Sequence, residues 1–333
     1  MRSFLFVTCL VLSFLKPEVG FSQGKNHYYC RKTFESLAVF REVPGDSAQM
    51  VWQFNYQPGM PTFFHPVYTP DGTLLTAEAP KDHPWHLGLW FCWKYINGLN
   101  YWEFSGDSKT RVSEGMTDQK RITIRTRYNG SARIRLDITY HPWYHPDSVA
   151  LLEVRKISIS APAGDGSYFI DFEHFFTAVN DVVLDRTPPQ TNARGIRWGG
   201  YAGLSVRFDQ KLSDPSFFSP ELDSMLSGKQ APWVAANLKT ESGNLVQMII
   251  CDHPDNPRSP VSWYCINRPN DRFWYYNAAI LYHEPIKLQA GQKMTLKYRV
   301  LVPAKPLTRA EIEGKRAERK VLGISRKSRK EPN

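Results

Sequence analysis

The stretch that decides the fold reads RITIRTRY at 121–128 and SARIRLDITY at 131–140, with an Asn-Gly pair between the two runs. In both runs isoleucine or leucine alternates with polar residues. Alternation of period two is the pattern of a strand with one buried face. Asn-Gly is the preferred two-residue hairpin turn, because both positions tolerate positive φ. The stretch therefore predicts an antiparallel hairpin closed by Asn129-Gly130.

The same strand signal recurs along the chain, whereas helical periodicity is confined to about 308–321. In that segment Thr308 is placed to cap the first turn and Glu311 follows three residues later. Further strands are expected at 48–55, 63–68, 86–94, 150–160, 168–177, 203–208, 234–239, 245–251, 261–265, 274–282 and 294–302. Many short strands joined by turns favour an all-β fold. We expect one large antiparallel β-sandwich with a short C-terminal helix.

The net charge of +10 raises the question of a nucleic-acid partner. Residues 308–333 carry nine basic and four acidic side chains, and residues 1–23 add one net positive charge, so the body at 24–307 keeps +4. That value is ordinary for its length, and a basic tail is most simply a solvated helix end. We expect no nucleic-acid partner. The sequence also lacks a Gly-rich phosphate loop, a nucleophile elbow and a repeat of 20–50 residues.

The N-terminus has the pattern of an export signal. Arg2 precedes an apolar run from Phe4 to Leu15 that is too short for a stable membrane anchor, and small residues follow at 22–24. No later run approaches 18 apolar residues, so we expect a periplasmic or secreted protein without a transmembrane anchor. The expected parts are a signal peptide at 1–23, a single sandwich domain at 24–307 and a basic helix and tail at 308–333.

Four cysteines remain once Cys9 leaves with the signal peptide. Export permits disulfides, and Cys30, Cys92, Cys251 and Cys265 allow three pairings among which the sequence does not choose. Cys92 lies in a very apolar segment and is expected to be a buried free thiol. No Cys-x-x-Cys pair is present, which argues against a structural zinc knuckle.

The densest chemistry lies at 64–104, where three of the nine histidines fall within 22 residues. Asp82-His83 and His86 stand just before a predicted strand, where loop side chains converge on a cleft held by a rigid sheet. If the strand alternates from His86, then Trp90 and Lys94 share its face. Polar groups beside a flat aromatic ring suit a sugar, whose C–H faces stack on the ring while its hydroxyls form hydrogen bonds.

The histidines of this segment also permit a metal site. His83 and His86 are an incomplete ligand pair, and His65 is the natural third ligand for a divalent transition metal. The competing interpretation is that His65 is a structural donor in a turn. Our leading expectation therefore includes no cofactor, and the metal site is the alternative.

A second candidate is the predicted strand at 168–178. Its alternation places Asp171 and Glu173 on one face, where paired carboxylates could divide acid and base roles at a glycosidic centre. The competing interpretation is a solvated strand face. His174 falls on the opposite face among apolar residues and is expected in the core.

Turn-rich segments supply the remaining candidates. The loop at 185–204 carries Arg186, Arg194, Arg197 and Trp198, and its arginines could hold a carboxylate or sulfate. The Pro-rich loop at 251–260 adds Arg258, and the segment at 282–284 adds His283. Each of these loops could also be a plain connection. The expected sugar-contacting residues are His65, Tyr68, Trp90, Lys94, Arg186, Trp198, Arg258 and His283.

Several blocks of sequence together resemble a known family. HPVYTPDG at 65–72, DHPWHLGLWFCWKYINGLNYW at 82–102, RTPP at 186–189, GGYAGLSVRF at 199–208 and DHPDNPRSP at 252–260 resemble the PmoA-like family of secreted bacterial proteins, often labelled "methane oxygenase". The resemblance implies polysaccharide use more than methane chemistry, because this chain has the sequence of an exported protein. It also implies a fold similar to the galactose mutarotase-type supersandwich, in which a His and a Glu act as acid and base. By that analogy Glu173, His174 and Glu284 are further candidates.

We therefore expect an exported carbohydrate-active enzyme acting on plant or algal oligosaccharides, with acidic sugars among its possible substrates. The reaction would be glycoside cleavage, elimination or epimerisation by general acid/base groups. His83, His86 and Glu173 are the expected proton-transfer groups, and Asp82 would orient a histidine. The alternatives are a metal-dependent oxidoreductase and a non-catalytic sugar-binding module.

Overall fold

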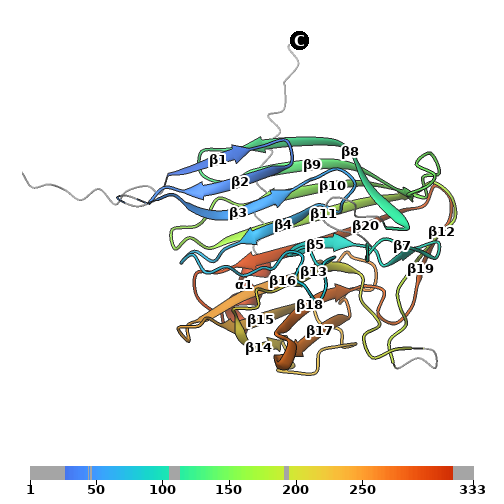
Figure 1. The fold of residues 1–333 in the computed structure, drawn as a ribbon. Coiled ribbons are helices and arrows are strands. Elements are labelled where there is room, and N and C mark those ends of the chain that lie inside the picture. Colours follow the sequence, from blue (N-terminus) through green and yellow to red (C-terminus); the bar gives the residue numbers. More distant parts are fainter. Residues whose placement is uncertain (1–26, 44, 46, 105–112, 191–194, 318–333) are drawn as a thin grey trace, which may run out of the picture.

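The computed structural model describes residues 27–43, 45, 47–104, 113–190 and 195–317. Two eight-stranded antiparallel sheets lie one over the other, and a four-stranded sheet lies at one end (Figure 1). The expected all-β sandwich with a short C-terminal helix is confirmed. The signal peptide expected at 1–23 lies outside the described residues. No helix in the described ranges is long and apolar enough to cross a membrane.

The first large sheet has the order β1-β2-β3-β4-β5-β13-β18-β17. Its strands are β1 (Tyr28–Lys32), β2 (Ser36–Arg41), β3 (Gln49–Asn55), β4 (Phe63–Val67), β5 (Leu89–Cys92), β13 (Gly203–Arg207), β18 (Phe273–Ala279) and β17 (Trp263–Arg268). A 3-10 turn, η1 (Pro269–Asp271), joins β17 to β18. Every residue of β5, β13 and β18 is buried. These central strands are therefore covered on both faces.

The second large sheet has the order β14-β15-β16-β20-β11-β10-β9-β8. Its strands are β14 (Ser213–Phe218), β15 (Trp233–Lys239), β16 (Leu245–Asp252), β20 (Lys293–Val302), β11 (Tyr168–Ala178), β10 (Leu151–Ile159), β9 (Ala132–Pro142) and β8 (Gly115–Thr126). The four-stranded sheet joins β19 (Ile286–Leu288), β12 (Val182–Asp185), β6 (Tyr95–Ile96) and β7 (Leu99–Asn100) in that order. The sequence pattern did not indicate β1, β2, β6, β7, β12, β14 and β19.

The deciding hairpin forms as β8 and β9, but its turn differs from the prediction. Arg127 N donates to Ser131 O and Gly130 N donates to Arg127 O, so the loop has three residues rather than two. Only Gly130 takes a positive φ, of +80°, and Asn129 does not. This is a type I turn followed by a left-handed glycine, which the Asn-Gly pair also permits.

The strand predicted at 86–94 is shorter, because it begins only at Leu89. Gly88 takes a φ of +76°, and a Cβ there would lie 2.5 Å from the Phe64 carbonyl oxygen. The chain before Gly88 is therefore a loop, and its side chains do not continue the alternation of β5. Within β5, Phe91 packs against His174 in the sandwich core, while Trp90 points away from the second sheet toward Tyr275.

The core between the sheets contains a buried charged network. The Glu153 carboxylate accepts from Arg155 Nε at 2.7 Å, from His174 Nδ1 at 2.8 Å and from the Tyr140 hydroxyl. Arg155 also donates to Thr62 Oγ1 at 2.9 Å. Burial would raise the pKa of Glu153, but Arg155 and His174 outweigh it and hold that pKa at about 2. Burial lowers the pKa of His174 to about 4. The expectation that His174 lies in the core is confirmed.

The C-terminal helix α1 (Arg309–Ala317) covers the outer face of the second sheet. Ile312 is fully buried against Trp233, whose Nε1 donates to Glu313 at 2.6 Å. The predicted cap is confirmed: Thr308 N donates to Glu311 Oε2 at 2.8 Å and Glu311 N to Thr308 Oγ1 at 3.4 Å. The four described cysteines are free thiols, and Cys92 is buried as expected.

Candidate active site

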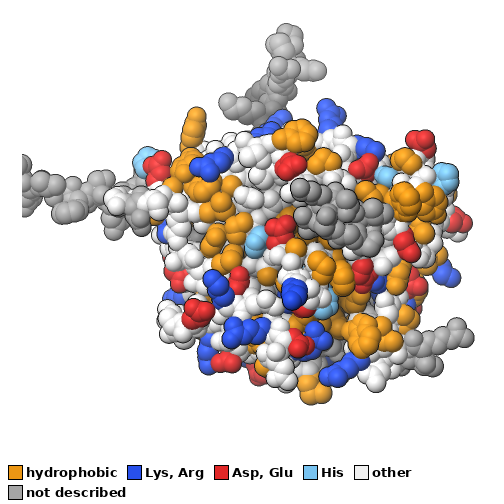
Figure 2. Space-filling view, viewed as in Figure 1, with side chains coloured by type: hydrophobic (Ala, Val, Ile, Leu, Met, Phe, Trp, Pro, Cys, Tyr) orange, Lys and Arg blue, Asp and Glu red, His pale blue; other side chains and the backbone are white. Residues whose placement is uncertain are grey.

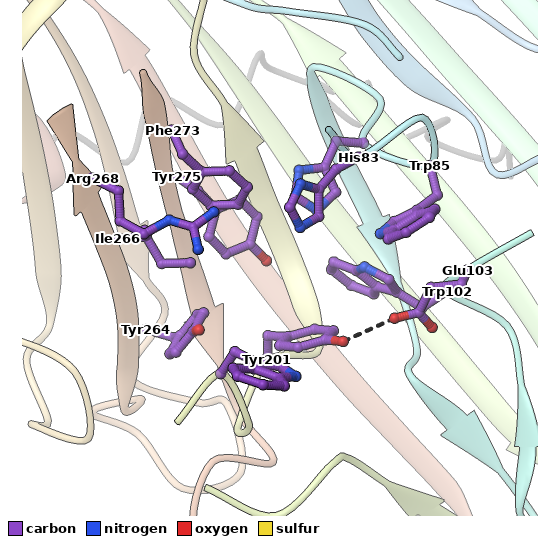
Figure 3. A pocket seen from close by; sticks show the side chains of 12 residues that line it. His83, Trp85, Trp102, Glu103, Tyr201, Tyr264, Ile266, Arg268, Phe273 and Tyr275 are labelled. Carbon is purple, nitrogen blue, oxygen red and sulfur yellow. Dashed lines mark hydrogen bonds between the residues drawn. The ribbon is translucent and has the colours of Figure 1, made fainter. Parts of the chain in front are cut away.

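A pocket of about 230 Å³ lies on the first large sheet, on the face away from the second sheet. The side chains of β18 fix this placement, because Tyr276 donates to Met248 O of the second sheet while Tyr275 points the opposite way into the pocket. Hydrophobic side chains and a histidine gather over β5, β13 and β18 in Figure 2. The pocket is lined by His83, Trp85, His86, Trp102, Glu103, Trp198, Tyr201, Tyr264, Ile266, Arg268, Phe273 and Tyr275 (Figure 3).

His83 is oriented by a carboxylate that a buried arginine holds in turn. Its Nδ1 lies 2.9 Å from Asp82 Oδ2, and Arg207 Nη2 donates to the same oxygen at 2.8 Å. Because a carboxylate only accepts, Nδ1 carries the hydrogen and Nε2 keeps the lone pair of the neutral ring. Burial, joined by the positive charges of Arg207 and Arg268, lowers the pKa of His83 against the opposing effect of Asp82. His83 is therefore a neutral base at neutral pH.

His86 packs behind His83 and is almost fully buried. Its ring stacks on His83 at 4.7 Å and on Tyr275 at 5.3 Å between ring centroids. Its Nδ1 is buried and has no hydrogen-bond partner among the described residues. Burial, with smaller contributions from His83 and Arg207, lowers the pKa of His86 well below its ordinary value. His86 is thus a neutral ring that holds His83 in place.

Glu103 lines the pocket next to Trp102 and is held by three donors. The Tyr201 hydroxyl donates to Oε1 at 2.9 Å, while Asn100 Nδ2, at 2.8 Å, and the Lys94 ammonium donate to Oε2. Figure 3 shows the Tyr201 contact. Lys94 is buried, and its Nζ also lies 5.5 Å from the centre of the Tyr201 ring. Both oxygens of the Glu103 carboxylate therefore accept hydrogen bonds.

Two arginines contact Phe273 in the remaining wall. Arg207 Cζ lies 3.9 Å and Arg268 Cζ 4.5 Å from the centre of its ring. Arg207 is fully buried, and its Nε and Nη1 have no hydrogen-bond partner among the described residues. Asp82 is therefore the group that balances the Arg207 charge. Arg268 is about half exposed and lies 3.3 Å from Asp271.

The structure gathers six of the predicted site residues at or directly behind this pocket. His83, His86 and Trp198 line it, and Trp198 is 62% exposed. Asp82, Trp90 and Lys94 stand behind the lining residues, in contact with His83, His86 and Glu103 respectively.

The structure does not bring Glu173 to the pocket. Asp171 and Glu173 share the outer face of β11, as the alternation predicted. Asp171 forms a two-pronged pair with Arg299 at 2.7 and 2.9 Å, and Glu173 lies between Lys156 and Lys297 in the sheet register. Both carboxylates therefore lie on a solvated strand face of the second sheet, among basic side chains. This agrees with the competing interpretation, in which they form a solvated face and not a catalytic pair.

Arg186 and Arg258 hold backbone instead of lining the pocket. Arg186 Nη2 donates to His283 O at 2.5 Å, and Arg258 donates to the carbonyls of Ile280, Glu284 and Pro285 at 2.7–2.9 Å. Both arginines therefore clamp the segment after β18. The His283 ring lies 3.2 Å from the Gly228 carbonyl. Arg194 lies outside the described residues.

His65 and Tyr68 also do not line the pocket. His65 Nδ1 lies 3.0 Å from Thr76 Oγ1, and burial lowers its pKa to about 4. The Tyr68 carbonyl accepts from the Tyr168 hydroxyl at 2.8 Å. Within the described ranges no group of three or more His, Cys, Asp or Glu side chains is arranged to hold a metal ion. A metal site formed by His65, His83 and His86 therefore stays a prediction, and the described residues offer no set of ligands for it.

The far side of the pocket was not identified from the sequence. Glu103 lies in the segment at 64–104 that is richest in candidate residues, but no role was predicted for it. An acidic residue directly after two aromatic residues, Tyr101 and Trp102, is the sequence feature that could have indicated it. Arg268, Phe273 and Tyr275 come from strands that lie more than 150 residues further along the chain. Alternation identifies such strands, but it does not say that they lie beside β5 and β13.

The family model described as "Family of unknown function (DUF6807)" matches residues 46–316. A search of curated proteins finds no match. Among solved structures the chain is similar to the "galactosidase domain of alpha-galactosidase-sucrose kinase, AgaSK", at 9% sequence identity and a TM-score of 0.34. That match covers 83% of this chain and 40% of the other, so this chain spans less than half of that structure. The PmoA-like resemblance stays a prediction. Because the family model spans most of the chain, the protein belongs to the DUF6807 family of unknown function.

Proposed function

We propose that this protein is an exported carbohydrate-active enzyme whose pocket binds a sugar ring and transfers protons through His83 and Glu103. The observation that carries the proposal is that these two groups line one aromatic pocket and each is fixed by its own partners. The exported location rests on the N-terminal sequence pattern alone. The proposed partner is an oligosaccharide, neutral or acidic.

The walls of the pocket support a sugar ligand. Seven of the twelve lining side chains are Trp, Tyr or Phe, and their ring faces suit the C–H faces of a sugar. At about 30 Å³ for each water, the volume corresponds to roughly seven or eight water molecules, which is the scale of one ring. His83, Glu103 and Arg268 supply a few polar groups at the edges, as oriented binding of hydroxyls requires.

The protonation states support a division of roles. His83 is a neutral base whose Nδ1–H is committed to Asp82, so Nε2 remains to accept a proton. Glu103 is an anion held by Lys94, and it suits a developing positive charge or a second proton transfer. Among the described residues Glu103 is the one carboxylate that lines the pocket. The geometry therefore favours proton transfer by a His and a Glu over a pair of carboxylates.

The test is a product assay on a panel of neutral and uronic-acid oligosaccharides with wild type, His83→Ala and Glu103→Gln. We expect each variant to lose turnover by about 100-fold or more while the Kd stays within a few fold. Exposed residues provide matched controls, His145→Ala and Glu241→Gln, which should match wild type.

Two results would count against the proposal. Full turnover by His83→Ala would show that His83 is not the base of the reaction. Binding of several panel members without any product would favour a non-catalytic sugar-binding module instead.

A further inference from the structure

Arg268 is the only lysine or arginine among the described residues that line the pocket. It ends β17, and its guanidinium lies 4.5 Å from the centre of the Phe273 ring. Figure 3 shows the guanidinium turned toward the space in front of Tyr275 and Tyr264. The contact with the Phe273 ring restrains the guanidinium, because an arginine is attracted to the face of an aromatic ring.

The Arg268 guanidinium keeps most of its donors for a ligand. Its Nε faces Asp271 at 3.3 Å, and both side chains are about half exposed. A guanidinium has five N–H donors in a planar fork, so four remain on the two Nη atoms. In the described part of the chain these Nη atoms have no hydrogen-bond partner. An oxyanion in the pocket could therefore accept two parallel hydrogen bonds from Arg268.

The charges around the pocket leave one cation in excess. Lys94 faces Glu103, Arg207 faces Asp82, and Arg268 faces Asp271. Arg197, exposed beside Trp198 at the rim, has no acidic partner among the described residues. Both Arg197 and Arg268 act on the Tyr264 phenol, where they oppose the burial that raises its pKa. The rim around Tyr264 is thus the positive side of the pocket.

We propose that the pocket selects a sugar that bears a ring carboxylate, with Arg268 as the group that receives the carboxylate. This inference rests on the proposed function, since it names the substrate class of the same site. A planar carboxylate matches the planar guanidinium of Arg268, and its negative charge balances the unpaired positive charge of Arg197 at the rim. The sugar ring then stacks on the aromatic wall, and His83 and Glu103 face its remaining edge.

The subsite expected from sequence was the arginine-bearing loop at 185–197, and the structure offers a different residue. Arg186 is committed to backbone carbonyls of the segment after β18. Arg197 remains as an exposed charge at the rim, because it adjoins Trp198 in the sequence and does not itself line the pocket. Among the described arginines, Arg268 is the one that lines the pocket, and both of its Nη atoms are available to a ligand.

The test compares each uronic-acid oligosaccharide of a panel with the same oligosaccharide after reduction of its carboxyl groups to alcohols. Binding is measured by isothermal titration calorimetry on wild type, Arg268→Gln, Arg268→Lys and Arg31→Gln. Arg31 is a matched control, because it is an exposed arginine over a phenylalanine ring, 4.9 Å from the Phe40 centre, on β1. A charge-assisted pair predicts that wild type binds a uronate about 10- to 100-fold more tightly than its reduced form.

We expect Arg268→Gln to abolish this discrimination, Arg268→Lys to keep only part of it, and Arg31→Gln to keep all of it. If Arg268→Gln does not fold, Arg268→Lys still tests the inference, because it should discriminate less than wild type between a uronate and its reduced form. Equal binding of oxidised and reduced ligands by wild type, or full discrimination by Arg268→Gln, would overturn the inference and leave the proposed function standing. If wild type binds neither form, nor any neutral sugar, then the proposed function itself fails.

Discussion

The buried Glu153 network gives a sharp prediction about stability. Glu153→Gln keeps the shape of the side chain but removes the charge that balances Arg155, and both residues are at most 1% exposed. The carboxylate accepts at 2.7 and 2.9 Å from Arg155, at 2.8 Å from His174 and also from the Tyr140 hydroxyl, so an amide loses acceptor capacity where four donors converge. Removing one partner of a fully buried pair costs about 3–5 kcal/mol, because the other charge is left uncompensated.

That cost is a large share of a typical folding free energy of about 5–15 kcal/mol. The assay is urea unfolding at pH 7 followed by tryptophan fluorescence, with the exposed Glu241→Gln as the control that should stay within about 0.5 kcal/mol of wild type. Replacing both charges, as in Glu153→Leu with Arg155→Met, should recover most of the loss, since no buried charge then remains unpaired. A cost below about 1 kcal/mol for Glu153→Gln would refute the idea that Arg155 depends on this carboxylate.

Three further predictions concern pH, the orientation of His83 and the C-terminal helix. His174, with its pKa lowered to about 4, stays neutral in the fold while the unfolded chain takes up a proton. His174 by itself should therefore lower the free energy of unfolding by about 3 kcal/mol from pH 6.5 to pH 4, and His65, whose pKa is lowered in the same way, adds to the fall. A flat profile in pH-dependent urea unfolding would contradict this. Asp82→Asn should lower turnover at least about 100-fold, because the amide removes the negative charge beside Nδ1 of His83 and leaves a single acceptor oxygen, which Arg207 also contacts. The variant should also move the acid limb of the pH–rate profile to lower pH, since Asp82 raises the pKa of His83; an unchanged profile would rule out this role. Thr308→Ala should destabilise the protein by about 1 kcal/mol through loss of the helix cap, and Thr308→Ser should restore it in the same unfolding assay.

Much of the fold follows from local pattern. Alternation in the hairpin at 121–140 gave the two strands and their buried faces, because period two is a property of each strand by itself. The turn between them was misjudged, since Gly130 alone supplies the positive φ that the loop needs. The strand before Leu89 was overextended, because a single left-handed glycine at 88 ends the alternation without changing the composition of the segment.

Most of the site residues that could be predicted lie close together in the sequence. His83, Asp82 and Lys94 lie close together in the sequence, so composition alone draws attention to them. Arg268 and Tyr275 reach the same pocket because β17 and β18 pair beside β13, which is a property of the sheet order. Glu173 shows the opposite error, in which a suggestive carboxylate lies on a strand of the other sheet.

The most direct test of the central claim is a crystal structure of the protein with a bound oligosaccharide from the panel that it binds. We expect a sugar ring in the pocket, stacked on the aromatic wall, with polar atoms of the sugar within hydrogen-bond reach of His83 Nε2 and of Glu103. A sugar bound elsewhere on the molecule, with the pocket left to solvent, would contradict the assignment of this pocket as the active site.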